Sequence, residues 1–447
     1  MKKLRYNVYF KVLAICIITL LLLIPASMIR GLIYERESTQ EQAIREVSSK
    51  WAEEQTLIGP FLSIPYTKYV TEFNKKDSTE KVVAIRKYLH VLPTQLTVTG
   101  DLNPEKRYRG IYEIVVYNSN IKLKGSFDPI DFKQFDIPTQ DIHFDKAEFV
   151  VGINDLRGIE EQITLDWNNK KLPFNPGVTS SDVVRSGINA QLPLSAEENK
   201  HSFELSLNLK GSQLLYFTPV GKITDVTISS AWNNPSFNGA FLPDNREVSE
   251  NGFSANWNVL HLNRNFPQAW VGSRYSLSDA AFGIDLLLPV DNYQKSYRSI
   301  KYALLFIGFT FLVFFFIEVL NKQFIHPIQY ILVGVALVVF FTLLVSISEH
   351  VKFNTAYIIS ALATLLLISG YVKAILKSNR LTLPITGILT ILYTFIFVII
   401  QLQDYALLIG SIGIFVILGL VMYFSRKIDW YNLNLAEKNT QADSTPQ

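Results

Sequence analysis

The sequence FIHPIQYILVGVALVVFFTLLVSISEH, residues 324–350, decides the fold of this 447-residue chain. Between Pro327 and Ser348 it contains no charged residue. A helix of about 20 residues spans the hydrocarbon core of a bilayer, so the segment predicts a transmembrane helix. His326 and His350 lie at its two ends, about 36 Å apart at 1.5 Å of rise per residue. They therefore cannot both belong to one metal site or one proton relay.

Further apolar segments lie near the start of the chain and on both sides of residues 324–350. They are Val12–Ile29, Tyr302–Leu320, Phe353–Val372, Leu381–Gln403 and Tyr405–Ser425. No Ala-x-Ala cleavage pattern follows the first segment, so we expect an uncleaved anchor rather than a signal peptide. The sequence predicts one N-terminal anchor helix and a C-terminal bundle of five transmembrane helices.

Basic residues indicate how these spans are oriented. Lys and Arg precede the first span, fill the loop Lys373–Arg380 and follow the last span at Arg426. Because basic residues are retained in the cytoplasm, we expect cytoplasmic termini and residues 30–300 outside the cytoplasm. Residues 30–300 contain 29 Lys and Arg against 33 Asp and Glu, a net charge of −4. This charge excludes the basic face that a nucleic-acid partner requires.

The segment after the anchor predicts a short amphipathic helix followed by strands. Ser38 and Glu41 form a capping-box pattern, and apolar residues recur at helical spacing up to Trp51. The helix must end before Gly59-Pro60. Beyond it, sequences such as YEIVVY, AEFVVGI and DVTISSAW alternate apolar and polar residues or are rich in β-branched residues, with turn residues between them. An all-β domain is therefore expected outside the membrane.

Weak similarities recur within the β segment at a spacing of roughly 110 residues. Gly100 and Gly110 precede one strand pattern as Gly211 and Gly221 precede another, and KGSFDP resembles NGAFLP. We interpret this as a duplicated β-sandwich-like unit, arranged as two lobes or as one merged sandwich. The predicted parts are 1–29 (cytoplasmic start and first span), 30–59 (amphipathic linker helix), 60–170 and 171–300 (two β units), 301–425 (five spans) and 426–447 (cytoplasmic polar tail).

Motifs for catalysis are not apparent in the chain. It has no G-x-S-x-G, no H-E-x-x-H and no phosphate loop, and its single cysteine cannot form an internal disulfide. The turn RYRG, residues 107–110, is basic and is interpreted as a solvated turn rather than an anion site. Ionisable residues of the bundle lie near the ends of spans, where we interpret them as anchors of helix ends rather than as a functional site. We expect no cofactor, no metal and no catalytic residue.

Long motifs along the chain resemble one known family. They include IYERESTQEQAIREVSSKWAEEQTLIGPFLSIPY, VLPTQLTVTGDLNPEKRYRGIYEIVVY, WNNPSFNGAFLP and IHPIQYILVGVALVVFFTLLVSISEH. From about residue 30 to about residue 425 the chain resembles the inner membrane protein CreD family. The family is associated with cell envelope integrity, tolerance to a colicin and envelope stress, without assigned catalytic residues. The resemblance implies a bacterial inner membrane location, and it marks as site candidates without an assigned role Glu35, Trp51, Gly59, Pro60, Arg107, Arg109, Gly110, Pro235, Phe237, Gly239, Glu318, His326, Pro327, Gln329, Tyr330, Ser348, Glu349 and His350.

Three hypotheses on function follow from these observations. The first is a non-enzymatic envelope factor, embedded in the lipid bilayer, whose β domain contacts a periplasmic protein or a cell-wall component. The second is a transporter or channel built from the five-span bundle, with Glu318, His326 and Glu349 near its mouths. The third is a membrane enzyme at the outer interface around Glu349 and His350. We expect coupling between the Glu349 end of the bundle and the helix that begins at Ser38.

Overall fold

The structure, a computed structural model, describes residues 8–74, 79–195, 200–286, 292–321, 324–402 and 405–426. Lys2, Lys3, Arg5 and the predicted tail beyond Arg426 lie outside these residues. The chain divides into two compact units. The membrane unit comprises residues 1–40 and 290–447, and the β unit comprises Glu41–Pro289.

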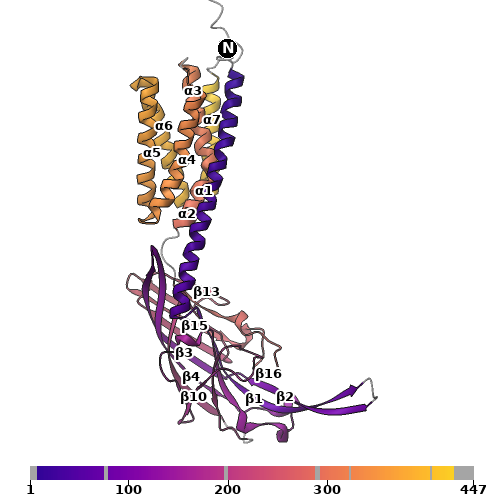
Figure 1. Ribbon diagram of the computed structural model, residues 1–447. Helices are drawn as coiled ribbons and strands as arrows, with labels where there is room; N and C mark the ends of the chain where they lie inside the picture. Colours follow the sequence, from indigo (N-terminus) through magenta and orange to yellow (C-terminus); the bar gives the residue numbers. More distant parts are fainter. Residues whose placement is uncertain are drawn as a thin grey trace, which may run out of the picture. The chain divides into compact units, whose positions relative to one another are not determined.

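The membrane unit consists of helices, as predicted. Six helices among the described residues are long and apolar enough to cross a membrane. They are α1 (Val8–Trp51), α3 (Ala303–Leu320), α4 (Pro327–Ser348), α5 (Phe353–Leu376), α6 (Asn379–Gln401) and α7 (Ala406–Ser425), and Figure 1 shows α3 to α7 side by side. The predicted order of one apolar helix, a β region and five apolar helices is confirmed.

The first helix is longer than predicted. Ser38 and Glu41 lie inside α1, so the predicted capping box and the separate linker helix are wrong. No glycine or proline occurs between Leu32 and Trp51, and nothing in the backbone therefore interrupts the helix. A second difference is α2 (Asn292–Lys301), a short helix in a segment assigned to the second β unit. It buries Tyr293, Ser296, Ser299 and Ile300.

Within the membrane unit, α1 packs through one face. Its buried residues up to position 40 are spaced three or four apart, as expected for a helix with one packed side: Ile18, Leu22, Ala26, Ile29 and Ile33. A Cβ atom at Gly334 of α4 would meet Leu22 Cδ1 at 2.1 Å and Phe311 Cζ at 2.9 Å. Glycine at this position therefore lets α1 and α3 approach α4 closely.

The β unit contains two sheets, whose strands Figure 1 shows as arrows. The nine-stranded sheet has the order β13 (Pro235–Gly239), β17 (Phe282–Leu286), β11 (Leu214–Phe217), β1 (Gln55–Asn74), β5 (Glu148–Ile153), β9 (Gly187–Gln191) and β8 (Asn175–Pro176), with β2 (Thr79–Val91) paired to β1 and β16 (Ala269–Val271) paired to β2. The eight-stranded sheet has the order β14 (Asn245–Ser249), β15 (Gly252–Leu260), β12 (Ile223–Ser230), β3 (Gln95–Arg109), β4 (Tyr112–Phe127), β10 (His201–Ser212), β6 (Thr164–Trp167) and β7 (Lys170–Pro173).

One hydrophobic core joins the two sheets. Alternating residues of β10, β12 and β15 are buried, as the period-two pattern predicts. Phe127 of the eight-stranded sheet packs against Phe149 of the nine-stranded sheet with ring centroids 6.3 Å apart. Trp257 and Phe282 make a similar contact at 5.5 Å. The two sheets therefore pack face to face as one sandwich.

The two predicted β units are merged in this sandwich. Both sheets contain strands from residues 60–170 and from residues 171–290, and the predicted boundary after residue 170 falls inside β7. Of the two arrangements considered, the merged sandwich is the one observed. Gly100 lies in β3 and Gly211 lies in β10, two strands that flank β4. Duplication remains a prediction that superposition of the two halves would test.

We predict that Gly239→Ala destabilises the β unit by about 2 kcal/mol or more, because it combines a strained conformation with a clash. Gly239 has φ +98°, and an added Cβ would lie 2.4 Å from the Ala281 carbonyl oxygen. Gly110→Ala is the control: its φ of +60° is also positive, but nothing lies within 4 Å. This control should cost only about 1 kcal/mol.

Denaturant unfolding followed by tryptophan fluorescence measures both variants, because five of the six tryptophans lie between residues 41 and 289. Equal losses for the two substitutions would contradict the steric explanation.

Candidate functional site: the polar contacts of the first helix

A buried carboxylate lies at the C-terminal end of α3. The Glu318 side chain is 6% exposed and forms an ion pair with Lys11 of α1. Its two oxygens also accept hydrogen bonds from the Ile325 amide at 3.1 Å and from the Tyr330 hydroxyl at 3.0 Å. The carboxylate thus joins α1, α3 and the first turn of α4. Charged hydrogen bonds of this kind, buried and fully partnered, hold helix ends in one arrangement.

The sequence motif IHPIQY forms the start of α4. His326 is the N-cap residue, and its Nδ1 accepts from the Ile328 amide at 3.3 Å. Gln329 completes a reciprocal capping box by accepting from the His326 amide at 3.0 Å. Pro327 occupies the first helical position, where its missing N–H costs nothing. These residues therefore fix the beginning of a helix, as the anchoring interpretation predicted.

A second polar cluster lies at the other end of α4. The Glu349 carboxylate is 3.6 Å from Arg36 Nε of α1 and accepts from the Tyr293 hydroxyl of α2 at 3.1 Å. The Ser348 carbonyl accepts from the Asn292 side chain at 2.7 Å. In contrast, the side chains of His350 and Glu35 are exposed. Within the membrane unit Glu349 contacts α1 through Arg36. The expected coupling of Glu349 to the helix that begins at Ser38 stays a prediction.

The β unit contains a third set of contacts with α1. The Trp51 indole donates to the Tyr117 carbonyl at 3.4 Å, and two cations lie over its ring, Arg107 at 4.8 Å and Lys210 at 4.7 Å from the centroid. Arg109 Nε lies 3.1 Å from the Glu46 carboxylate. The residues of the turn RYRG are exposed, as the solvated-turn interpretation predicted, and two of them also contact an aromatic and an anionic side chain of α1. Trp51, Arg107 and Arg109 are brought together by the fold.

Asp155 and Arg157 hold the chain where α1 ends and β1 begins. The Asp155 carboxylate accepts from the Glu53 amide at 2.9 Å and from Arg157, whose guanidinium also donates to the Ser49 carbonyl. Gln55, fully buried, donates to the Asp155 carbonyl at 2.9 Å. Burial raises the pKa of the Asp155 carboxyl, but the hydrogen bonds from Arg157 and from the backbone outweigh it and lower the pKa below its usual range. The carboxylate is therefore charged and fully engaged at neutral pH.

The remaining motif residues shape strands and turns. Gly59 has φ +120° and, with Pro60, lies where the pairing of β1 with β5 shifts register. Gly110 forms the turn between β3 and β4. In β13, which begins at Pro235 and ends at Gly239, the Phe237 ring packs against Phe253 and Trp257. These positions serve the backbone and the core.

Comparison with known proteins decides the family. A family model described as "Inner membrane protein CreD" matches residues 7–431. The chain belongs to the CreD family. This family member is 34% identical over 455 residues to the inner membrane protein CreD of Escherichia coli (strain K12), a similarity that covers 99% of this chain and 98% of that protein.

Among solved structures, an M1 zinc metallopeptidase from Deinococcus radiodurans matches 38% of this CreD family chain and 38% of its own chain. The identity is 8% and the TM-score is 0.17. A mutant of the same enzyme gives 9% and 0.18. At these TM-scores the similarity carries no argument about fold or function.

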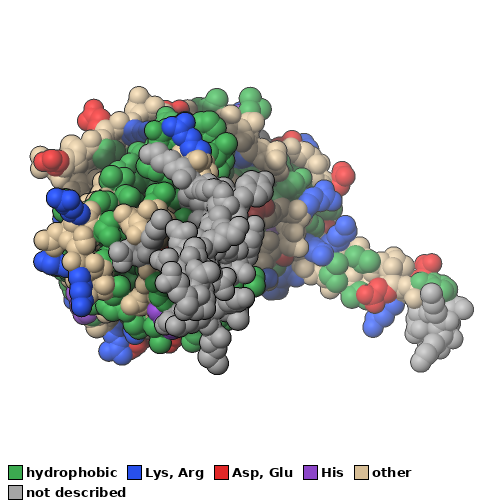
Figure 2. Space-filling view, turned by 90° about the horizontal axis from the view of Figure 1, so that it is seen from above, with side chains coloured by type: hydrophobic (Ala, Val, Ile, Leu, Met, Phe, Trp, Pro, Cys, Tyr) green, Lys and Arg blue, Asp and Glu red, His purple; other side chains and the backbone are tan. Residues whose placement is uncertain are grey.

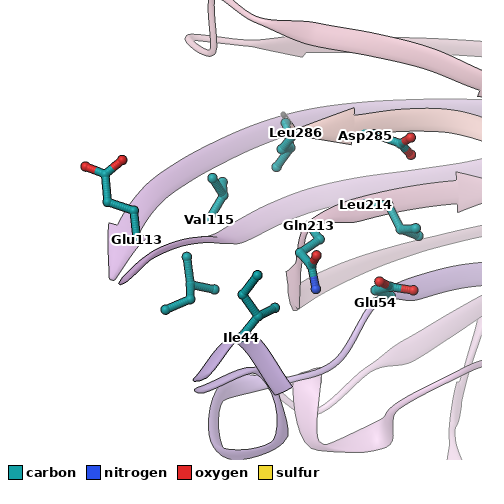
Figure 3. Close-up of a pocket in the computed structure, with 9 residues that line it drawn as sticks. Ile44, Glu54, Glu113, Val115, Gln213, Leu214, Asp285 and Leu286 are labelled. Atoms are coloured by element: carbon teal, nitrogen blue, oxygen red, sulfur yellow. The ribbon is translucent and has the colours of Figure 1, made fainter. Parts of the chain in front are cut away.

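A small cavity of about 260 Å³ opens beside α1 in the β unit of this CreD family chain. Figure 3 shows Ile44 of α1 facing strand residues across the opening, with Gln213 and Glu54 on one side. Burial, Asp285 and Glu53 raise the pKa of the Glu54 carboxyl. Among its lining residues there is neither histidine nor cysteine. Nothing in this lining resembles a nucleophile with its base.

Sequence reasoning found the motif residues but missed most of their partners. Lys11 and Arg36 were considered only for their charge and their side of the membrane, and Glu46, Tyr293 and Asp155 were not singled out. Within the described part of the chain no group of three or more His, Cys, Asp or Glu is placed to hold a metal ion. Charged residues inside or beside apolar helices, such as Lys11 and Arg36, were the sequence feature that could have predicted these partners.

We predict that Glu318→Gln destabilises the membrane unit by about 3 kcal/mol, because it leaves Lys11 partly buried without its counter-charge. The double variant Lys11→Met with Glu318→Gln should recover most of this loss, since apolar replacement of a buried ion pair is often neutral.

Thermal loss of the helical circular dichroism signal in detergent measures this stability. Lys373→Met, at an exposed position, is the control and should change it by less than about 0.5 kcal/mol. If the double variant is no more stable than Glu318→Gln alone, the two side chains are not coupled.

Proposed function

We propose that this CreD family chain supports cell envelope integrity as a non-enzymatic inner membrane protein. In this proposal the β unit lies in the periplasm and contacts a periplasmic protein or a cell-wall component. The membrane unit anchors the protein in the lipid bilayer. The association of the family with envelope stress and colicin tolerance motivates the physiological part of the proposal.

The observation that carries this proposal is how the ionisable motif residues are used. Glu318 is partnered by Lys11, Tyr330 and a backbone amide. Glu349 is partnered by Arg36 and Tyr293. Carboxylates held in this way are suited to fixing helices relative to one another, whereas a general base must face its substrate. This use supports a structural role and weakens the enzyme hypothesis at Glu349 and His350.

The transporter hypothesis retains one supporting observation. Between α5 and α6 the bundle contains buried hydroxyl groups, with Tyr357 donating to the Tyr393 carbonyl at 2.8 Å. Ser360 Oγ is buried and has no hydrogen-bond partner among the described residues. Unsatisfied polar groups inside a membrane bundle are uncommon and often line a water-filled path. Solute flux into vesicles containing the purified protein, absent from protein-free vesicles, would favour transport over the proposal.

The expected topology has both termini in the cytoplasm and residues 30–300 in the periplasm. Its basis is the cluster of basic residues before α1 and in the loop after α5. Reporter fusions after Lys377 and within residues 100–250 should report opposite sides of the membrane. Reporters on the same side would exclude this topology.

We predict that Arg36→Gln or Glu349→Gln reduces survival under envelope stress toward that of cells without the protein. Each substitution breaks the contact between α1 and the Glu349 end of α4, in which the Glu349 side chain is 11% exposed and the Arg36 side chain 46%. Survival is measured after colicin or detergent challenge in cells that lack their own CreD family protein.

Glu35→Gln, one residue from Arg36 on the exposed surface of α1, is the matched control and should behave as wild type. His350→Ala should also behave as wild type if only contacted residues matter. Protein level and membrane insertion must be unchanged in every variant. Full survival of the Arg36 and Glu349 variants at normal protein level would refute the role of this contact.

A further inference from the structure

Strands β1 and β2 continue well beyond the sheet that they belong to. They pair with each other from Leu62↔Val91 to Asn74↔Thr79. The pairing of β1 with β5 ends at Ser63, and β16 pairs with β2 only at residues 89–91. Residues 67–74 and 79–87, which we name the arm, therefore form a two-stranded ribbon without a further strand on either edge in the described chain. Figure 1 shows the arm leaving the body of the β unit.

One face of the arm bears three exposed apolar side chains, and Glu80 lies on the same face, opposite Phe73. Tyr69 lies opposite Ala84, and Val82 lies opposite Thr71, so Tyr69, Phe73 and Val82 share a face. They are 61%, 60% and 63% exposed, respectively. A two-stranded ribbon has no core that could bury them. A cluster of exposed apolar side chains on a protruding element is typical of an interaction surface.

The arm is also basic, in contrast to the unit that bears it. Its described side chains include four cations, Lys68, Lys81, Arg86 and Lys87, and two carboxylates, Glu72 and Glu80, a net charge of 4 − 2 = +2. Residues 30–300 as a whole carry −4. Glu72 lies opposite Lys81 in the pairing register, whereas no ion pair of the described residues includes Lys68, Arg86 or Lys87. Figure 2 shows green, blue and red side chains together on this protrusion.

We propose that the arm binds the surface of a bilayer that contains anionic phospholipid. Tyr69, Phe73 and Val82 enter the interfacial layer, where an aromatic ring with a hydroxyl is favoured, and the three cations contact phosphate groups. Arg86 extends from the apolar face, and the long stems of Lys68 and Lys87 let their ammonium groups reach the same surface from the other face.

Charge and chemistry select this partner over the alternatives. Two arms placed edge to edge would bring like net charges together, which disfavours a second copy of the chain. A phosphate-rich polymer offers anions without an apolar layer and would leave the aromatic face in water. A bilayer offers both within a few ångströms, and its headgroup region is wet enough to satisfy the open strand edges.

The test uses the full-length protein in nanodiscs of neutral phosphatidylcholine, mixed with vesicles that can be sedimented. Vesicles containing phosphatidylglycerol should bind the protein at least about tenfold more tightly than pure phosphatidylcholine vesicles, and added salt should reduce this difference. Replacing Lys68, Arg86 and Lys87 by Glu should abolish the preference, since each lost cation weakens binding about fivefold. Tyr69→Ser with Phe73→Ser should weaken binding to the same vesicles.

Matched controls come from the same unit. Leu262→Ser, at a position 81% exposed, and Lys170→Glu, also exposed, remove an apolar and a basic side chain outside the arm and should bind as wild type. A dye attached to Tyr69→Cys in a Cys16→Ala background should shift to shorter emission wavelength only with anionic vesicles.

Three results would overturn the proposal. Equal binding to both vesicle types would show that charge plays no part. Wild-type binding by the arm variants would place the contact elsewhere. Disulfide-linked dimers formed through Tyr69→Cys without vesicles, together with an unshifted dye, would assign the arm to a second copy of the chain.

Discussion

The membrane unit depends on one buried carboxylate. Glu318 lies among apolar side chains at a helix end, where an unpaired negative charge would cost several kcal/mol. Three donors offset this cost: Lys11 of α1, the Ile325 amide in the loop between α3 and α4, and the Tyr330 hydroxyl of α4. Satisfying the carboxylate requires all three elements to meet at one point. The loop conformation, the first turn of α4 and the position of α1 thus follow from one electrostatic constraint.

The same first helix is secured by different chemistry in the β unit. Around Trp51 the contacts are cation–π pairs and partly exposed ion pairs, each worth little alone in water. The buried Gln55 and the hydrogen-bonded Asp155 add stronger contacts. If one of these hydrogen bonds were lost, the buried polar group would have no water to replace its partner. The helix α1 is continuous and has residues in both units, so it contributes one set of contacts to each.

These arrangements separate two kinds of segment in this CreD family chain. The polar motif residues whose contacts are described hold helices and strands in place, while the exposed and chemically distinctive part of the β unit is the arm, with its apolar face and surplus of cations. The rigid parts and the part suited to a partner are thus built from different segments. The β sandwich, with its single core, bears the arm, and the first helix and the bundle anchor the protein in the inner membrane.

Much of this architecture was determined by the sequence alone. Apolar runs longer than a bilayer is thick predict membrane helices, and period-two alternation predicts strands, because both signals are local. The limits of α4 at Pro327 and Ser348 were correct for this reason. Tertiary structure decided what depends on distant residues: that Lys11 meets Glu318, that Arg107 stacks on Trp51, and that the two predicted β units share one core. It also decided that Ser38 lies within a helix rather than at its start, since a capping pattern acts only where packing ends the helix. Contacts of this kind depend on where the fold places each side chain, and no local pattern encodes that position.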